Sequence, residues 1–266
     1  AGLSDDLLLA NEVLDTKRLS TIAENGANVT VAVDSKETID AVASGGVSNI
    51  LIDVNVGLRR CGCAVPEAGN LGEYARNKGL NIRGVMGYEG HLMMVKNRST
   101  QAEEVKSAMA LLMLAHKDVG GQIISAGGTG TFDINIWATE IQAGSYLFMD
   151  TEYAKLDLPF SQCLTVMSRV ISIAPDKSWA VVDAGIKALG MDHGNPSVSG
   201  GVVGFCSDEH TTLYPPEGQS KVTWKIGDLV PLLPAHVDPT IAKHSRMLAF
   251  EDERLVEEWV IDLKGW

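Results

Sequence analysis

The order of apolar and polar positions divides the chain into two regions of different predicted structure. Over roughly the first 150 residues, short apolar runs alternate with amphipathic stretches of helical period. The predicted strands are Leu7–Ala10, Val29–Val33, Ile50–Val54, Ile82–Met86, Gln122–Ser125 and Glu140–Ala143. The clearest helical stretches between them are Ser35–Ala43, Pro66–Lys78 and Thr100–His116. Because these strands are continuously apolar, we expect a parallel sheet that helices cover.

Repeated strand-then-helix units build either a barrel or an open, doubly wound sheet. Glycine-rich polar segments follow three predicted strands, at Gly57–Gly62, Gly87–His91 and Gly127–Thr131. Barrel enzymes carry their chemistry on the loops at these strand ends. The sequence shows about six units, whereas a closed barrel needs eight. We therefore predict an α/β fold of the (β/α)8, TIM-type barrel kind that lacks its first strands, with an open six-stranded sheet as the alternative.

From residue 151 onward the pattern becomes rich in short β-type runs. The predicted strands are Leu164–Ala174, Trp179–Asp183, Gly201–Cys206, Val222–Lys225, Leu229–Leu233 and Met247–Phe250. Turn signals such as Pro175-Asp176 and Gly227-Asp228 separate them. We therefore predict two domains. Residues 1–150 would form the partial barrel, and residues 151–266 a mostly antiparallel β domain.

Composition and charge narrow the class of protein. With 45% hydrophobic and 21% charged residues, the 266-residue chain has the composition of a soluble globular protein. The net charge of −12, without a basic face, argues against a nucleic-acid partner. The longest apolar run, Ala108–Ala115, is too short to cross a membrane, and the first residues lack the basic start of a signal peptide. The four cysteines match neither a disulfide framework nor a paired zinc motif, so we expect reduced thiols in a cytoplasmic protein.

Two segments carry the strongest local chemistry. Gly127–Thr131 (GGTGT) directly follows a predicted strand, and the backbone N–H groups of such a turn can close around a phosphate. A plain tight turn is the alternative. His236 and Asp238 stand two apart in a segment that we expect to be extended, so both side chains would face one side. A nitrogen and an oxygen ligand suit a divalent metal, although a solvated pair is the simpler interpretation.

Other candidates stand at the ends of predicted strands. Arg60 lies in a glycine-rich loop, where a guanidinium can donate to a phenolate, carboxylate or phosphate. Tyr88 and His91 follow another strand and offer an aromatic ring and a possible general base. Each is also typical of an ordinary surface loop. Their occurrence at successive strand ends is what favours a shared site.

Taken together, these segments resemble the D-threonine aldolase and D-serine dehydratase family, the metal-activated branch of the fold-type III pyridoxal-phosphate enzymes. The matching motifs are NVGLRRCG, GYEGH, SAGGTGTFDI, TEIQAGSYLFMD, DAGIKALG, DEH and LPAHVDPT, in the family's order and over nearly the whole chain. The resemblance implies a barrel with a C-terminal β domain. It also implies a homodimer whose active sites lie near the subunit interface.

The resemblance assigns a role to individual residues. The residues that would hold the phosphate of pyridoxal 5'-phosphate are Gly128, Thr129, Gly130, Thr131, Gly144 and Ser145. Arg60 would reach the phenolic oxygen of the cofactor, and Tyr88 would lie against its pyridine ring. Gln142 would stand near the pyridine nitrogen. His236 and Asp238 match the metal-binding pair of the family.

The implied reaction is retro-aldol cleavage of β-hydroxy-D-amino acids, with D-threonine giving glycine and acetaldehyde. A divalent metal would bind the β-hydroxyl and lower its pKa, and His91 or a metal-bound water is the candidate base. The family's dehydratases tend to carry cysteine where this chain has Asp238. A carboxylate suits manganese or magnesium better than zinc, which favours the aldolase. The alternatives are a D-serine or 3-hydroxyaspartate dehydratase, a β-hydroxyaspartate aldolase, or a carrier of the cofactor without activity.

Two departures from the family pattern carry their own expectations. Many D-threonine aldolases have Tyr-His-Gly where this chain has Tyr88-Glu89-Gly90, so Glu89 and His91 would mark a subgroup with another substrate, such as β-hydroxyaspartate. The Schiff-base lysine of the family belongs on the first barrel strand. None of the thirteen lysines stands in a comparable place. We therefore expect that lysine upstream of residue 1.

Overall fold

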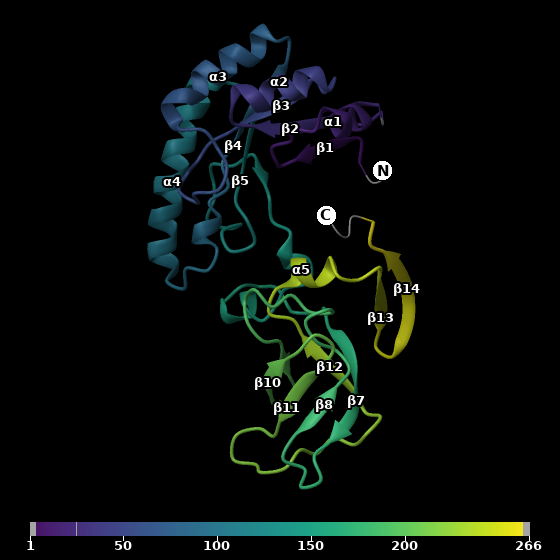
Figure 1. The fold of residues 1–266 in the computed structure, drawn as a ribbon. Coiled ribbons are helices and arrows are strands. Elements are labelled where there is room, and N and C mark those ends of the chain that lie inside the picture. The colour runs from purple at the N-terminus through teal and green to yellow at the C-terminus, as the bar shows by residue number, and fades with distance from the viewer. Residues whose placement is uncertain (1–3, 25, 263–266) are drawn as a thin grey trace. The chain divides into compact units, whose positions relative to one another are not determined.

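The computed structural model describes residues 4–24 and 26–262. The chain divides into two compact units, Ala1–Gly144 and Ser145–Trp266 (Figure 1). The sequence had placed the domain boundary between residues 150 and 151, a few residues later.

The first unit is built on one parallel sheet. Its strands are β1 (Asp6–Leu9), β2 (Asn28–Val33), β3 (Asn49–Asp53), β4 (Asn81–Met86), β5 (Ile123–Ala126) and β6 (Glu140–Ile141). They lie in the order β1-β2-β3-β4-β5-β6, and each neighbouring pair is parallel. A doubly wound sheet reverses its strand order at a switch point, whereas this order runs in one direction throughout. The sheet is therefore part of a barrel wall, as predicted: it has six strands, and its order is not that of a doubly wound sheet.

Helices connect these strands and bury their apolar sides against the sheet. They are α1 (Thr16–Ala23), α2 (Lys36–Ser44), α3 (Val65–Asn77) and α4 (Arg98–Val119). Asp15 caps α1 by accepting from two backbone N–H groups, and Ser35 begins α2 with a capping box. Val31, Ile52 and Leu112 are fully buried in a common core of strands and helices. This core holds the carboxyl ends of the strands in fixed positions.

The second unit contains an antiparallel sheet, as the sequence predicted. Its strands are β7 (Val166–Ile173), β8 (Ala180–Val182), β9 (Ser197–Val198), β10 (Val202–Cys206), β11 (Thr211–Tyr214) and β12 (Leu229–Leu233). They lie in the order β10-β11-β8-β7-β12-β9. The unit also holds α5 (Val237–Ile241) and a hairpin of β13 (Arg246–Glu251) and β14 (Arg254–Val260). It holds the short 3-10 helices η2 (Ser145–Leu147) and η3 (Tyr153–Lys155), while η1 (Gly90–Leu92) belongs to the first unit.

The strand predicted at Val222–Lys225 is wrong. The backbone N–H of Val222 donates to the carbonyl of Lys177 at 2.9 Å, but that of Lys225 donates to the Asp228 carboxylate at 2.8 Å. The turn before β12 therefore captures the end of this segment before a ladder can form. Among the residues that the structure describes, no helix is both long and apolar enough to cross a bilayer.

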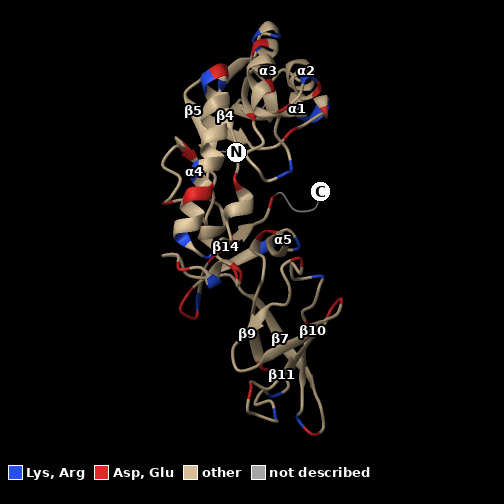
Figure 2. Cartoon of the chain, turned by 90° about the vertical axis from the view of Figure 1, so that its left-hand side faces the viewer, with Lys and Arg blue, Asp and Glu red and all other residues tan. Residues whose placement is uncertain are grey.

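Charged positions of both signs are distributed over both units. In Figure 2 the lysines and arginines are interspersed with aspartates and glutamates along the helices and loops. This mixed distribution differs from the basic face that nucleic-acid binding proteins present.

Candidate functional site

Three loops at the carboxyl ends of neighbouring strands touch one another in the first unit. A Cβ atom added to Gly57, after β3, would lie 2.8 Å from the His91 imidazole, after β4. One added to Gly128, after β5, would lie 3.0 Å from the Tyr88 ring. The Arg60 guanidinium carbon is 5.6 Å from the centre of that ring. The structure therefore brings together the three glycine-rich segments that the sequence singled out at strand ends.

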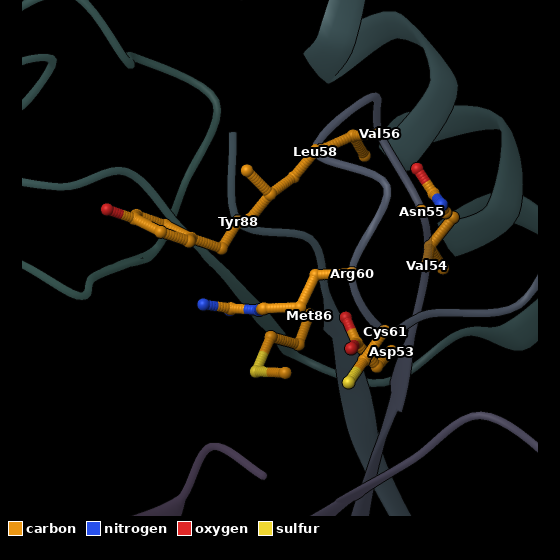
Figure 3. A pocket seen from close by; sticks show the side chains of 9 residues that line it. All are labelled: Asp53, Val54, Asn55, Val56, Leu58, Arg60, Cys61, Met86 and Tyr88. Carbon is orange, nitrogen blue, oxygen red and sulfur yellow. The ribbon is translucent and has the colours of Figure 1, made fainter. Parts of the chain in front are cut away.

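A pocket opens between the loops that follow β3 and β4. Its lining includes Arg60, Tyr88, Asp53 and Cys61. Figure 3 shows the Arg60 and Tyr88 side chains extending toward the same side, away from the paired Asp53 and Cys61. The described residues that line this pocket include no lysine. The pocket can thus offer a cation and an aromatic face to a ligand.

The Gly127–Thr131 loop is held by one buried carboxylate, Glu89, whose exposed fraction is 0%. Glu89 Oε2 accepts the backbone N–H of Gly127 at 2.9 Å. Its Oε1 accepts the Thr131 hydroxyl and the Asn135 amide, both at 2.9 Å. Gly127 has a φ of 78°, which favours glycine. Glu89 therefore fixes both ends of the turn.

A second set of contacts holds the same loop at Gly130. The carbonyl of Gly130 accepts from Arg98 Nη1 at 2.9 Å and from Gln101 Nε2 at 3.1 Å. Both donors lie in the first turn of α4, and Gln101 is fully buried. A Cβ atom at Gly130 would collide with the carbonyl oxygen of Met93. Contacts with Glu89 on one side and with α4 on the other therefore hold the loop in one conformation before any ligand binds.

These contacts involve one of the predicted phosphate ligands, Thr131. The Thr131 hydroxyl donates to Glu89 and accepts the N–H of Gly128 at 3.2 Å, so its hydrogen bonds lie within the protein. Thr131 thus supports the loop from inside. Glu89, which the sequence took as the mark of a subgroup with another substrate, is buried beneath the loop. Neither role could be seen from the GGTGT motif alone.

Gln142 lies beside the same loop but is held by its own contacts. Its Nε2 donates to the Ser125 hydroxyl at 3.0 Å, and that hydroxyl donates to Glu140 Oε1 at 2.6 Å. These bonds fix the amide at the end of β6. Gly144 ends the first unit and Ser145 begins the second. Their predicted contribution to a phosphate site stays a prediction.

A cluster of acidic groups and thiols lies at the base of the pocket. Burial raises the pKa of Asp53 to about 8, together with a hydrogen bond to Glu12 and the negative charges of Glu12 and Asp34. A hydrogen bond to Glu12, with burial and nearby carboxylates, raises the pKa of Cys61 to about 11. Burial raises the pKa of Cys63 to about 12. These thiols are therefore protonated at neutral pH and poor nucleophiles.

The predicted metal pair lies in the second unit, where α5 begins. His236 is the N-cap of α5, with φ −142° and ψ 119°, and Asp238 lies in the first helical turn. His236 Nε2 is 3.5 Å from Asp238 Oδ2. The side chains do converge, but the expected extended segment is wrong. The His236 and Asp238 side chains lie close together because α5 begins at Val237, between the two residues.

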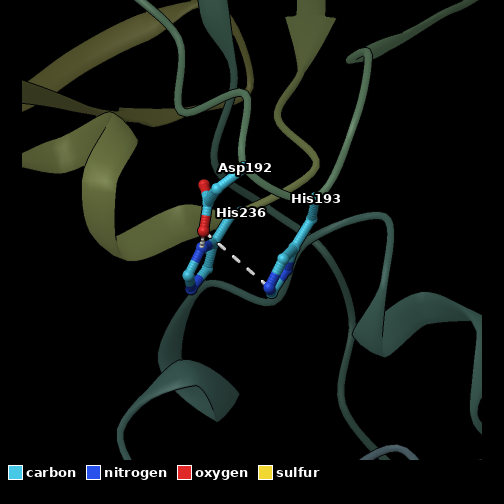
Figure 4. Close-up of side chains that lie close together, drawn as sticks. All are labelled: Asp192, His193 and His236. Atoms are coloured by element: carbon cyan, nitrogen blue, oxygen red, sulfur yellow. Dashed lines mark hydrogen bonds and ion pairs between the residues drawn. The ribbon is translucent and has the colours of Figure 1, made fainter.

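Two further residues, which the sequence analysis left out of the site, surround His236 (Figure 4). Asp192 Oδ2 lies 2.6 Å from His236 Nδ1. The imidazole of His193 stacks on that of His236, with ring centres 4.0 Å apart and planes inclined by 8°. Burial opposes ionisation of Asp192, but the hydrogen bond to His236, a backbone hydrogen bond and two nearby imidazoles lower its pKa below the ordinary value.

The backbone around His236 is fixed by buried polar groups. The Asp150 carboxylate, which is fully buried, accepts the N–H of Val237 at 3.1 Å. The Thr240 hydroxyl donates to the carbonyl of His236 at 2.7 Å and accepts the N–H of Gly190 at 2.9 Å. The start of α5 is thus tied to the segment that carries Asp192.

The geometry of His236 and Asp238 fits a divalent ion. Two ligands bonded to one ion at about 2.1 Å lie about 3.0 Å apart at the right angle of an octahedral site and about 3.4 Å apart at a tetrahedral angle. The 3.5 Å between His236 Nε2 and Asp238 Oδ2 lies near the upper of these separations, so a small side-chain movement would suit an octahedral ion. One nitrogen and one carboxylate oxygen, with remaining positions for water or substrate, form a donor set that suits manganese or magnesium.

Comparison with known proteins gives an independent view of both units. The family model described as alanine racemase, N-terminal domain, matches residues 1–152, which is more than half of the chain. The chain belongs to this family. A serine dehydratase domain model matches residues 163–250 of the second unit. The two matches together cover the barrel wall and the antiparallel sheet.

Individual relatives lie among enzymes of D-amino acids. A D-threonine aldolase from Arthrobacter sp is 29% identical, covering 100% of this chain and 76% of the relative. A 3-hydroxy-D-aspartate aldolase from Paracoccus denitrificans is also 29% identical, covering 98% and 74%. The crystal structure of D-threonine aldolase from Filomicrobium marinum superposes with a TM-score of 0.87 at 28% identity, over 97% of this chain and 76% of that one. The resemblance drawn from the sequence motifs is therefore confirmed.

Proposed function

We propose that the chain is a lyase that cleaves β-hydroxy-D-amino acids by a retro-aldol reaction, with D-threonine giving glycine and acetaldehyde. The observation that carries this proposal is the His236–Asp238 pair, whose 3.5 Å separation suits a divalent ion, in a chain similar to D-amino acid aldolases. The substrate is a small D-amino acid. Retro-aldol cleavage requires the β-hydroxyl to lose its proton, which a bound cation favours.

The first unit would hold pyridoxal 5'-phosphate. Arg60 would donate to its phenolic oxygen, and Tyr88 and Gln142 would contact its ring. Gly128, Thr129, Gly130 and Thr131 would form the loop around the phosphate, and Glu89 holds this loop from behind through Gly127 and Thr131. When bound, this cofactor supplies an acceptor for the electrons of the Cα bond that breaks. The preformed loop supports tight phosphate binding, since little ordering remains to be done.

The second unit would hold the metal through His236 and Asp238. When bound, manganese or magnesium supplies a Lewis acid for the β-hydroxyl. His91 is the candidate base, since its ring is exposed and lies against the Gly57 turn. The homodimer and the cytoplasmic location stay predictions from the sequence.

A β-hydroxyaspartate is the second candidate substrate for the same reaction. It is favoured by the 29% identity to a 3-hydroxy-D-aspartate aldolase, which equals the identity to a D-threonine aldolase. The two substrates differ at the β-substituent, methyl in one and carboxylate in the other. Comparing kcat/KM for both would rank them directly.

The test is product analysis with the full-length protein, pyridoxal 5'-phosphate and manganese. The proposal predicts glycine and acetaldehyde in equal amounts from D-threonine, and glycine and glyoxylate from a β-hydroxy-D-aspartate. Formation of a 2-oxo acid with ammonia would instead identify a dehydratase. If the protein binds the cofactor but forms neither the aldolase products nor the dehydratase products, only the carrier hypothesis would remain.

A further inference from the structure

The two ring nitrogens of His236 face different carboxylates. Nδ1 lies 2.6 Å from Asp192 Oδ2, and Nε2 lies 3.5 Å from Asp238 Oδ2. A neutral imidazole carries a proton on one nitrogen and a lone pair on the other. The nitrogen that donates a hydrogen bond to one carboxylate cannot bind a metal, so the other nitrogen is the one available to it.

The contact between Asp192 and His236 is a hydrogen bond and unlike a pair of ligands to one ion. Two ligands at about 2.1 Å from an ion lie about 3.0 Å apart even at a right angle. The observed 2.6 Å is shorter than that and matches a charge-assisted hydrogen bond. In such a pair the imidazole N–H donates and the carboxylate oxygen accepts, which assigns the proton to Nδ1.

His193 cannot share an ion with His236 in this arrangement. An imidazole binds a metal in the plane of its ring, along the nitrogen lone pair. The two rings are nearly parallel, with an 8° inclination and 4.0 Å between centres. An ion in the plane of one ring would therefore stand well out of the plane of the other. The stack instead limits rotation of the His236 ring.

The segment that carries Asp192 is tied to α5 independently of this hydrogen bond. Thr240, almost fully buried, links the N–H of Gly190 to the carbonyl of His236. A Cβ atom at Gly190 would collide with the Pro239 ring, so the two segments are in close contact. Asp192 is thus presented to His236 from a fixed backbone.

We propose that Asp192 is a positioning residue for the metal site: it accepts the Nδ1–H of His236 and so leaves the Nε2 lone pair directed toward Asp238. This inference rests on the proposed function, because it takes His236 and Asp238 as the ligands. Partners of this kind fix the tautomer and ring orientation of a ligating histidine, and their loss typically costs about 10–100-fold in metal affinity.

The experiment uses Asp192→Ala and Asp192→Asn, with His236→Ala as the reference and Glu217→Gln, an exposed carboxylate on the turn after β11, as the matched control. Manganese affinity is measured from the electron paramagnetic resonance signal of free ion. The His236 tautomer is measured in metal-free protein by long-range 1H–15N spectra. We expect Asp192→Ala to weaken manganese binding about 10–100-fold and to shift His236 away from the Nδ1–H tautomer. Asp192→Asn, which can still accept, should have a smaller effect, and Glu217→Gln none.

The possible failures can be distinguished. If His236→Ala abolishes manganese binding but Asp192→Ala has normal affinity and tautomer, the positioning role is wrong and the proposed function stands. If Asp192→Ala weakens binding with no change of tautomer, Asp192 is itself a ligand and the inference is overturned. If His236→Ala retains manganese, the metal site of the proposed function fails, and this inference fails with it.

Discussion

Replacing Glu89 with glutamine removes the charge that anchors the Gly127–Thr131 loop while keeping the size of the side chain. The glutamine carbonyl can still accept from Thr131 and Asn135, as Oε1 does now. Its amide group then faces the N–H of Gly127, which currently donates to Oε2 at 2.9 Å. Two donors would oppose each other in a site with no exposed surface.

The expected magnitude follows from that loss. A hydrogen bond to a charged group contributes about 1.5–3 kcal/mol, and a buried donor without an acceptor costs about 1–3 kcal/mol. We therefore expect Glu89→Gln to lower the free energy of unfolding by about 3 kcal/mol. Binding of pyridoxal 5'-phosphate should weaken as well, because the loop must be ordered when the ligand binds.

Urea denaturation and a cofactor titration measure the two effects. Glu73→Gln, an exposed carboxylate on α3, is the matched control and should change stability by less than about 0.5 kcal/mol. A Glu89→Gln protein with the stability and cofactor affinity of the wild type would show that Glu89 does not anchor the Gly127–Thr131 loop. Lower stability with unchanged cofactor affinity would show that Glu89 supports the fold without shaping a phosphate site.

Three more predictions concern buried residues of the first unit. Because the pKa of Asp53 is raised to about 8, the folded protein holds a proton that the unfolded chain has lost, so stability should fall as pH rises from about 4 to about 8. Asp53→Asn should flatten this slope in denaturation measured across that range, and an unchanged slope would contradict the assignment. Thr131→Ala should destabilise the fold by about 1–3 kcal/mol, because Glu89 and Gly128 each lose a partner. Thr129→Ala should weaken cofactor retention, and an unaltered cofactor affinity would argue against its place in a phosphate site.

The sequence predicts the first unit well because its strands are long apolar runs separated by capped helices. All six predicted strands there correspond to observed ones, and the barrel type follows from their order. The second unit is harder to predict. Thr211–Tyr214 forms a strand whose two threonines are buried, so the periodic apolar signal is missing. Val222–Lys225 is the opposite case, because its apolar and polar residues alternate as in a strand but no strand forms. The N–H of Lys225 donates to the Asp228 carboxylate in the turn before β12.

The site was predictable only where residues share a short motif. His236 and Asp238 stand two apart, and Tyr88 lies in one strand-end loop, so sequence spacing could suggest them. Glu89 and Asp192 could not be assigned, because their partners are 38 and 44 residues away. Their roles depend on tertiary contacts, which leave no local pattern. The sequence could show only that Glu89 directly follows the predicted ligand Tyr88, which does not reveal that it holds the Gly127–Thr131 loop.

The proposal that a metal ion at His236 drives retro-aldol cleavage is tested by the dependence of catalysis on added manganese. The measurement is the rate of glycine formation from D-threonine as manganese is added back to chelator-treated protein, for the wild type and for His236→Ala. We predict that the wild-type rate rises in proportion to bound manganese, while His236→Ala neither binds the ion nor gains activity. A wild-type rate that is independent of manganese, or a His236→Ala protein that is fully activated by it, would contradict the account.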